Sequence, residues 1–284
     1  MLCLLTKNNA RLLPQFFKAM EQLDYPKEKL RWVWMYGKSI DFTLKLILEF
    51  HAKHPEYKYQ VYEEPPIERP IRSSLCNALL YEEFKSLWRG EPFILFLDTE
   101  IEEIPPNALK KLIKADKDII APYIYLSKSN LFYSSYLFYL DGQRFDLIFK
   151  DGHRHTIADP PFKYEKEPVE LDSVGTMVLI KSEAFLETQW ANPIPFYQFC
   201  KNAKAKGLKV WAMPCIKVYH SRIEDSRYLL EWYVAKGVLP ETELSKIGFK
   251  KRNGKWTLGK EREMFGLGGE KQEMFEKKFE EIMK

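Results

Sequence analysis

One apolar run that ends in two acids constrains the fold of this chain more than any other stretch. Phe93-Ile94-Leu95-Phe96-Leu97 is uninterrupted, and Asp98-Thr99-Glu100 follows it directly. A run of this length without polar alternation predicts a strand buried on both faces, as in a parallel sheet covered by helices. Ligands of open α/β sheets bind outside the carboxyl ends of the strands, and the two acids fall at such an end.

Asp98 and Glu100 suit a hard metal ion. They are two residues apart, so their side chains point the same way on an extended backbone. Paired carboxylates are oxygen ligands for Mg²⁺ or Mn²⁺, and such a site leaves room for substrate phosphates. The alternative is that both acids are only solvated residues at a strand end. We predict the metal site, with Mn²⁺ or Mg²⁺ as its cofactor.

Apolar runs and helical patterns alternate along the first half of the chain. We expect strands at 2–5, 30–36, 57–62, 93–97 and 119–124, with helices at 12–23, 42–50, 75–88 and 107–114. Further strands are expected at 174–180 and 209–219, and a helix at 195–206. This order predicts an α/β fold, a single Rossmann-like domain with a mostly parallel central sheet and right-handed crossovers.

Two stretches break that alternation. Residues 127–169 are rich in Tyr and Phe and carry turn signals at Asp141-Gly142 and Asp151-Gly152, which predicts a hairpin or irregular insertion. Long insertions often act as lids or binding loops, although the aromatic residues of this one also fit a core. Residues 223–284 are charged, and we predict a C-terminal helical extension that ends in an amphipathic helix over 271–283. That helix fits packing on the domain, a homodimer contact, or peripheral contact with a membrane surface.

Composition narrows the class of protein. The formal net charge of the 284 residues is only +4 and the charges are mixed, so no basic patch points to nucleic acid as a partner. The four cysteines include no CxxC pair, and we expect reduced thiols in a cytoplasmic protein. No run of about 18 apolar residues occurs, so we expect no transmembrane helix.

The motifs resemble those of a known family. Asp98-Thr99-Glu100, the segment Leu171–Lys181, the segment Gly207–Trp211 and His220 resemble the GT-A fold glycosyltransferases, broadly family 2. Asp172-Ser173-Val174-Gly175-Thr176-Met177 is especially similar to the fungal mannosyltransferases of the mannan-polymerase type. The resemblance covers about residues 1–222. It implies a UDP- or GDP-sugar donor and a glycan, lipid-linked or protein acceptor, with the insertion at 127–169 on the acceptor side.

The resemblance also implies roles for individual residues. A DxD-type motif would bind the metal through Asp98 and Glu100, with His220 as a late additional ligand. Asp172 lies in the segment that lines the sugar site and is our candidate catalytic residue on the acceptor side. The nucleotide-sugar site is expected to use Thr6, Asn8, Asn9, Gly37, Ser39, Arg72, Asn77, Asp98, Thr99, Gly175 and Thr176.

Two departures from the family pattern keep other functions open. Tyr36 stands where an acid is common, and Pro195–Cys200 has no carboxylate where family 2 enzymes often carry the general base. A sugar-nucleotide nucleotidyltransferase is one alternative, but Thr6–Ala10 lacks the glycines of its phosphate loop. A catalytically degenerate protein that binds only sugar or a partner is another. We favour the metal-dependent glycosyltransferase.

Overall fold

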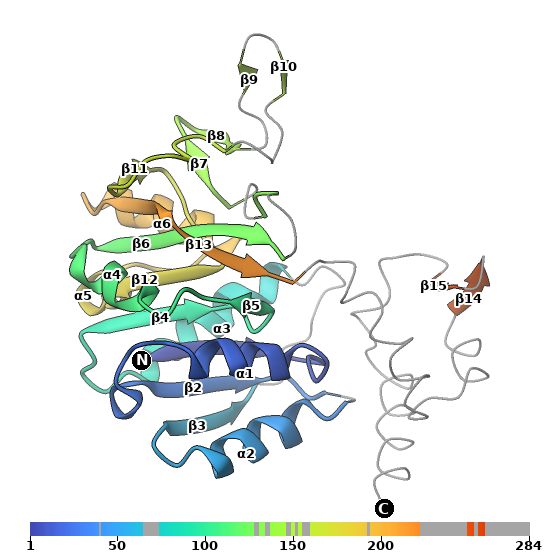
Figure 1. The fold of residues 1–284 in the computed structure, drawn as a ribbon. Helices are drawn as coiled ribbons and strands as arrows, with labels where there is room; N and C mark the ends of the chain where they lie inside the picture. Colours follow the sequence, from blue (N-terminus) through green and yellow to red (C-terminus); the bar gives the residue numbers. More distant parts are fainter. Residues whose placement is uncertain are drawn as a thin grey trace, which may run out of the picture.

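A nine-stranded sheet forms the centre of the molecule. The computed structural model describes residues 1–39, 41–64, 74–127, 131–133, 137–145, 149–150, 153–154, 160–191, 194–221, 249–252 and 255–258. The strand order is β11-β13-β6-β12-β4-β1-β2-β3, and β5 pairs with β13 at one end (Figure 1). These strands are β1 Leu2–Thr6, β2 Arg31–Tyr36, β3 Lys58–Glu63, β4 Phe93–Leu97, β5 Ile101–Glu103, β6 Ile119–Leu126, β11 Val169–Leu171, β12 Met177–Lys181 and β13 Val210–His220.

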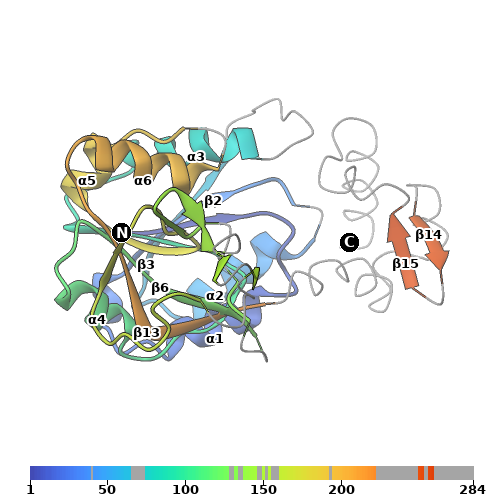
Figure 2. The same ribbon diagram turned by 90° about the horizontal axis from the view of Figure 1, so that it is seen from above.

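Helices cover both faces of the sheet. α1, α2 and α4 lie on one face, and α3, α5 and α6 lie on the other, as the view along the sheet shows (Figure 2). Their bounds are α1 Leu13–Glu21, α2 Thr43–Lys53, α3 Ser74–Ser86, α4 Ala108–Lys114, α5 Ser182–Glu187 and α6 Pro195–Ala205, with a short 3₁₀ turn at Lys27–Lys29. The layers are therefore helix, sheet and helix, as the α/β prediction requires.

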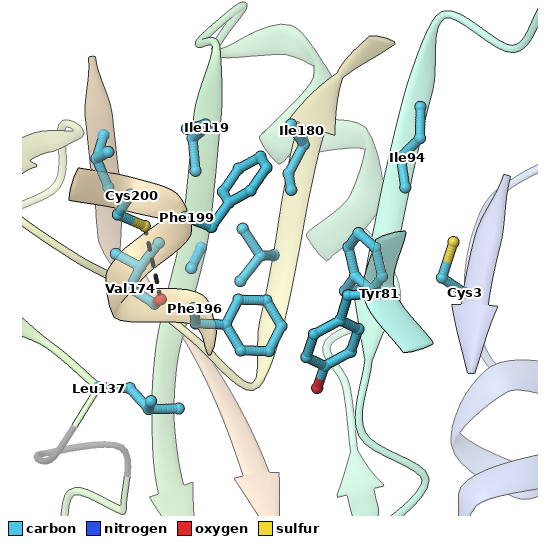
Figure 3. Close-up of a cluster of buried hydrophobic side chains, with 14 of the residues drawn as sticks. Cys3, Tyr81, Ile94, Ile119, Leu137, Val174, Ile180, Phe196, Phe199 and Cys200 are labelled. Carbon is cyan, nitrogen blue, oxygen red and sulfur yellow. Dashed lines mark hydrogen bonds between the residues drawn. The ribbon is translucent and has the colours of Figure 1, made fainter. Parts of the chain in front are cut away.

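β4 shows why its sequence has no alternation. Ile94 and Phe96 belong to the core under α3, α5 and α6, while Leu95 and Leu97 belong to the core under α1, α2 and α4. In the first of these cores Phe196 and Phe199 of α6 pack over the sheet, and the Cys200 thiol lies 4.0 Å from the Val174 carbonyl oxygen (Figure 3). Both faces of β4 are buried, so the side chains on both of its faces are apolar.

The sheet is mostly parallel with defined exceptions. β1 pairs in parallel with β2 and β4, β2 with β3, and β6 with β13. β12 runs antiparallel between β4 and β6, and β11 and β5 run antiparallel to β13. The carboxyl ends of β1, β2, β4, β6 and β13 therefore meet at one edge, marked by the arrowheads of β6 and β13 in Figure 1. We call this the carboxyl edge.

The insertion contains the hairpins that its turn signals predict. β7 Tyr139–Leu140 pairs with β8 Gln143–Arg144 across Asp141-Gly142, and β9 Phe149–Lys150 pairs with β10 His153–Arg154. Asp141 and Gly142 have φ values of 51° and 74°. A tight hairpin turn needs such positive φ at both central residues, and Asp-Gly tolerates it.

The last segment is partly described. β14 Phe249–Arg252 and β15 Lys255–Leu258 form an antiparallel pair. These residues are therefore strands, where the sequence predicted a helical extension. The expected helix at 271–283, with its membrane or dimer contact, lies outside the described residues.

Two further findings bear on the class of protein. Within the described ranges, no helix is long and apolar enough to cross a membrane. Cys3, Cys200 and Cys215 are free thiols, and the first two are buried.

Candidate active site

Asp98 and Glu100 lie at the carboxyl edge, in the turn that leads from β4 into β5. The Asp98 N–H donates to the Thr176 carbonyl at 3.1 Å, and the Ile101 N–H donates to the Asp98 carbonyl at 3.2 Å. Thr99 between them is buried. The turn is thus fixed by backbone hydrogen bonds on both sides, which leaves the two carboxylates to project beside each other.

The two carboxylates are hard to ionise together. Burial, followed by the nearby charge of Glu100, raises the pKa of Asp98 to about 7. Burial also raises the pKa of Glu100. Desolvation and a like charge both disfavour the ionised form, and a bound cation would relieve both effects.

His220 ends β13 and faces Glu100. Its side chain is 2% exposed, and its Nε2 lies 3.5 Å from the Glu100 Oε2. The Nδ1 lies 2.7 Å from the Ser221 carbonyl oxygen, so we assign the ring N–H to Nδ1. Burial lowers the pKa of His220 to about 4, against the opposing effect of that hydrogen bond. The imidazole is therefore neutral near pH 7, and its Nε2 lone pair points toward a carboxylate oxygen.

This arrangement fits a metal ion without enclosing one. Metal-binding histidines usually donate their other ring N–H to a carbonyl or carboxylate, as His220 does. The described residues contain no group of three or more His, Cys, Asp or Glu side chains placed to hold a metal ion. Among the described residues, the side chains therefore do not form a complete metal shell, and a bound ion would need further ligands such as phosphate or water.

The loop after β1 is joined to the loop after β2. The backbone N–H of Asn8 donates to Ser39 Oγ at 2.9 Å, and that of Asn9 donates to Thr43 Oγ1 at 2.7 Å. The Gly37 N–H donates to the Thr6 carbonyl at 2.9 Å. These contacts bring five of the residues predicted for the nucleotide-sugar site into one place.

A side-chain contact connects these loops to the acid pair. Asn9 Nδ2 donates to Thr99 Oγ1 at 2.6 Å, and both side chains are buried. The Thr6 hydroxyl is buried nearby and has no hydrogen-bond partner among the described residues. An unpaired buried hydroxyl is uncommon in a folded protein, so this one is a candidate for a ligand contact.

Comparisons with known proteins place this geometry in context. No family model matches the chain. A curated relative, a Glycosyltransferase 25 family member of Drosophila melanogaster, is 28% identical over 141 residues, which are 44% of this chain and 22% of the relative. The chain therefore spans about a fifth of that relative's length.

Solved structures match a larger share of this chain than the Drosophila relative does. S. aureus TarS 1–349 in complex with UDP-GlcNAc has a TM-score of 0.51 at 11% identity and covers 78% of this chain and 58% of its own. The mannosyltransferase PcManGT of Pyrobaculum calidifontis, in complex with GDP-Man and Mn²⁺, has a TM-score of 0.51 at 13% identity. The match covers 87% of this chain and 63% of PcManGT. GalNAc-T7 with UDP, GalNAc and Mn²⁺ has a TM-score of 0.52 at 15% identity. The match covers 78% of this chain and 42% of GalNAc-T7.

The chain has the GT-A fold.

Gly175 of this GT-A fold packs against the insertion. We expected it to let a sugar approach the backbone closely. A Cβ at this position would lie 2.3 Å from Leu137 Cδ1 and 2.8 Å from Leu137 Cβ. The space beside Gly175 is therefore filled by a side chain of the insertion. Thr176, with a φ of 71° and 1% exposure, still reaches the site through its carbonyl contact with Asp98.

Asp172 is engaged by other parts of the GT-A domain. Its Oδ2 accepts the Gly142 N–H at 2.8 Å, and its Oδ1 pairs with the Lys204 ammonium. Burial raises the pKa of Asp172, but the hydrogen bonds from Lys204 and Gly142 outweigh it and bring the pKa below its usual value. The carboxylate thus ties the β7–β8 turn to α6.

Asp172 also follows a strand that ends far from the carboxyl edge. Leu171 pairs with Val210 at the start of β13, whereas His220 ends that strand. On the neighbouring strand β6, Val210 pairs with Ile119 and His220 pairs with Leu126, and these two residues are seven positions apart. At about 3.3 Å per residue this separation is about 23 Å. The structure does not bring Asp172 together with the acid pair, and its catalytic role stays a prediction.

Two other predicted residues cannot be placed. Arg72 and the side chain of Asn77 lie outside the described residues.

Three residues beside the site are not among the predicted site residues. Asp41 is buried and accepts the N–H groups of Ala10 and Thr43, each at 3.0 Å, as well as the Thr43 hydroxyl. An Asp two residues before a helix is a known turn signal and could have revealed this role. Tyr133 and Ser221 contact His220. The sequence marks Tyr133 only as one of many aromatic residues of the insertion, and no pattern singles out Ser221.

Proposed function

We propose that this chain is a metal-dependent glycosyltransferase. It would move a sugar from a nucleotide-diphosphate donor to a glycan, a lipid-linked or a protein acceptor. The observation that supports this most directly is the pair Asp98 and Glu100 at the carboxyl edge of a GT-A sheet, with the neutral His220 facing Glu100. The name of the Drosophila relative agrees with sugar transfer.

The residues of the site would have separate roles. Asp98 and Glu100 would hold Mn²⁺ or Mg²⁺ through their oxygens, and His220 would offer Nε2. When bound, the cation supplies charge neutralisation to the departing diphosphate. The buried turn around Thr99 keeps the carboxylates in place, and Asn9 links that turn to the β1 loop.

The donor nucleotide would lie against the joined loops after β1 and β2. Thr6, Asn8, Asn9, Gly37 and Ser39 are gathered there. The similar solved structures contain UDP-GlcNAc, GDP-Man or UDP, so a UDP- or GDP-sugar is the donor class to test. Mannosyl transfer, the finer proposal from the sequence resemblance, makes GDP-mannose one of these donors.

A catalytically degenerate binding protein is the second candidate. One observation favours it: the first turn of α6, Pro195–Gln198, carries no carboxylate where a general base was expected. The carboxylate of Asp172, the residue predicted to be catalytic, is held by Lys204 and Gly142. Such a protein would still bind nucleotide sugar but would not turn it over.

A thermal-shift screen tests the proposal. The full chain is heated with UDP, GDP, UDP-GlcNAc, UDP-GalNAc or GDP-mannose, each with and without Mn²⁺. A ligand that binds the folded state raises the melting temperature, by an amount that grows with its concentration over Kd. We expect one nucleotide class to raise it, and Mn²⁺ to enlarge the shift. Unchanged melting temperatures with every ligand would count against both candidates, and release of nucleoside diphosphate from the bound donor separates enzyme from binder.

A further inference from the structure

His220 lies face to face with an aromatic ring. The centroids of its imidazole and the Tyr133 ring are 4.0 Å apart, and the ring planes are 20° from parallel. Tyr133 belongs to the insertion at 127–169, whereas His220 ends a strand of the central sheet. The stacked pair therefore links the insertion to the proposed metal site.

Tyr133 is itself held in place. Its N–H donates to the Ile124 carbonyl of β6 at 2.8 Å. Phe132 beside it forms a bridge with Tyr125 and is 1% exposed, so it anchors the segment in the core. The Leu126 N–H donates to the Leu131 carbonyl at 2.8 Å, which closes this short return of the chain against β6. The backbone that carries the Tyr133 ring is therefore fixed against β6.

The contacts of His220 define the orientation of its ring. Ser221 accepts the Nδ1 hydrogen at one edge, and Glu100 lies opposite Nε2 at the other. The backbone is fixed too, since the Ser127 N–H donates to the His220 carbonyl at 2.7 Å. One hydrogen bond leaves the ring free to tilt about the line of that bond. A ring stacked on its face removes this remaining freedom.

We propose that Tyr133 is a positioning residue that holds the His220 imidazole with Nε2 toward Glu100. Through it, the insertion would set the metal affinity of the site. This inference rests on the proposed function, because it assumes that His220 binds the metal. Residues that orient a metal-binding histidine change metal affinity by about 10- to 100-fold when they are removed.

The test is a titration of the full chain with Mn²⁺, in which the signal of free Mn²⁺ is followed by electron paramagnetic resonance. Tyr133→Leu removes the ring, Tyr133→Phe keeps it, and His220→Ala removes the ligand. Tyr139→Leu is the matched control, because Tyr139 is a tyrosine of the same insertion whose ring packs on Tyr197. Circular dichroism and melting temperature confirm that each variant is folded.

We expect Tyr133→Leu to weaken Mn²⁺ binding about 10-fold, and Tyr133→Phe and Tyr139→Leu to stay within about twofold of the wild type. Wild-type affinity in Tyr133→Leu, with weakened binding in His220→Ala, would overturn the role of Tyr133 alone. Equal Mn²⁺ binding in the wild type and His220→Ala would overturn His220 as a ligand, and the role of Tyr133 with it.

A second measurement on the wild-type protein covers the case in which Tyr133→Leu does not fold. The imidazole Cε1–H resonance of His220, identified by its loss in His220→Ala, should be shifted upfield relative to the histidine resonance of the unfolded chain. The cause is the ring current of the stacked tyrosine, and the nitrogen shifts should show the hydrogen on Nδ1. An unshifted resonance, or a hydrogen on Nε2, would contradict the stacked orientation.

Discussion

Both carboxylate oxygens of Asp172 make contacts within the domain. Its oxygens are engaged by the Gly142 N–H and the Lys204 ammonium, and the side chain is 28% exposed. Asp172→Asn keeps an acceptor for Gly142 and loses an ion pair that at such exposure contributes about 0–1 kcal/mol. We therefore expect turnover within about threefold of the wild type. A loss of about 100-fold or more with intact donor binding would instead restore Asp172 as general base.

Gly175 is needed for packing. Adding a Cβ there brings it to 2.3 Å from Leu137 Cδ1, so Gly175→Ala should lower the free energy of unfolding by about 1–3 kcal/mol, the usual range for overpacking. Urea denaturation measures this. The double variant Gly175→Ala/Leu137→Ala is the control, because trimming Leu137 should recover part of the loss. Additive effects of the two substitutions would show that no clash is involved.

His51 predicts a pH dependence of stability. Its Nε2 accepts the Trp34 Nε1–H at 3.0 Å, and burial, followed by the neighbouring charge of His54, lowers the pKa of His51 to about 4. The unfolded chain takes up a proton near pH 6.5 and the folded chain does not, so stability is full above pH 6.5 and falls as the pH drops toward 4. At about 1.4 kcal/mol per pKa unit the loss is about 3 kcal/mol. Chemical unfolding across this range should show a steeper pH dependence in the wild type than in His51→Gln, and equal slopes would contradict the assignment.

Single residues were predictable where chemistry and position coincide. Asp98, Glu100 and His220 have rare donor groups at strand ends, and the structure brings Glu100 and His220 within 3.5 Å. Asp172 has the same chemistry but follows a strand whose direction the sequence does not reveal. A carboxylate at a strand end points to a ligand only when that end belongs to the carboxyl edge.

At the scale of elements, Asp41 organises the donor loops. It accepts the N–H groups of Ala10 and Thr43, one from each loop. Asp41→Ala would leave both buried donors unpaired, at a cost of about 1–3 kcal/mol each. We expect a lower free energy of unfolding together with weaker nucleotide binding, measured by urea denaturation and calorimetry. Asp24→Ala is the control, because Asp24 is exposed and forms a surface ion pair with Lys110. Equal effects of the two substitutions would remove Asp41 from this role.

Long elements followed from the sequence, and short ones did not. The seven strands and five helices expected across residues 2–219 all occur, because each has enough residues to show its period or a buried run. β5, β11 and α5 have 3, 3 and 6 residues, too few for a period, and they form because neighbouring strands or loops hold them. The helical prediction for the extension is wrong for β14 and β15, where lysine-rich sequence still forms a hairpin.

At the scale of the whole molecule, the site depends on pairings between distant segments. Glu100 meets His220 because β5 pairs antiparallel with β13, which places Ile101 opposite His220. The Ser221 N–H then donates to the Glu100 carbonyl at 2.9 Å. The alternation of strands and helices predicts a sheet, but it does not predict this order or the reversed direction of β12. The sequence could therefore suggest a metal site, but it could not predict the strand pairings that bring Glu100 and His220 together.

The most direct test of this account is calorimetric titration of UDP or GDP, chosen from the thermal-shift screen, with and without Mn²⁺. Wild type is compared with Asp98→Asn and Glu100→Gln, and Glu103→Gln serves as the control because Glu103 is an exposed carboxylate of the adjoining β5. We predict that Mn²⁺ strengthens nucleotide binding in the wild type and in Glu103→Gln. In Asp98→Asn and Glu100→Gln this gain should fall by at least about 10-fold with the fold intact. A gain of wild-type size in both variants would contradict the metal site at the end of β4.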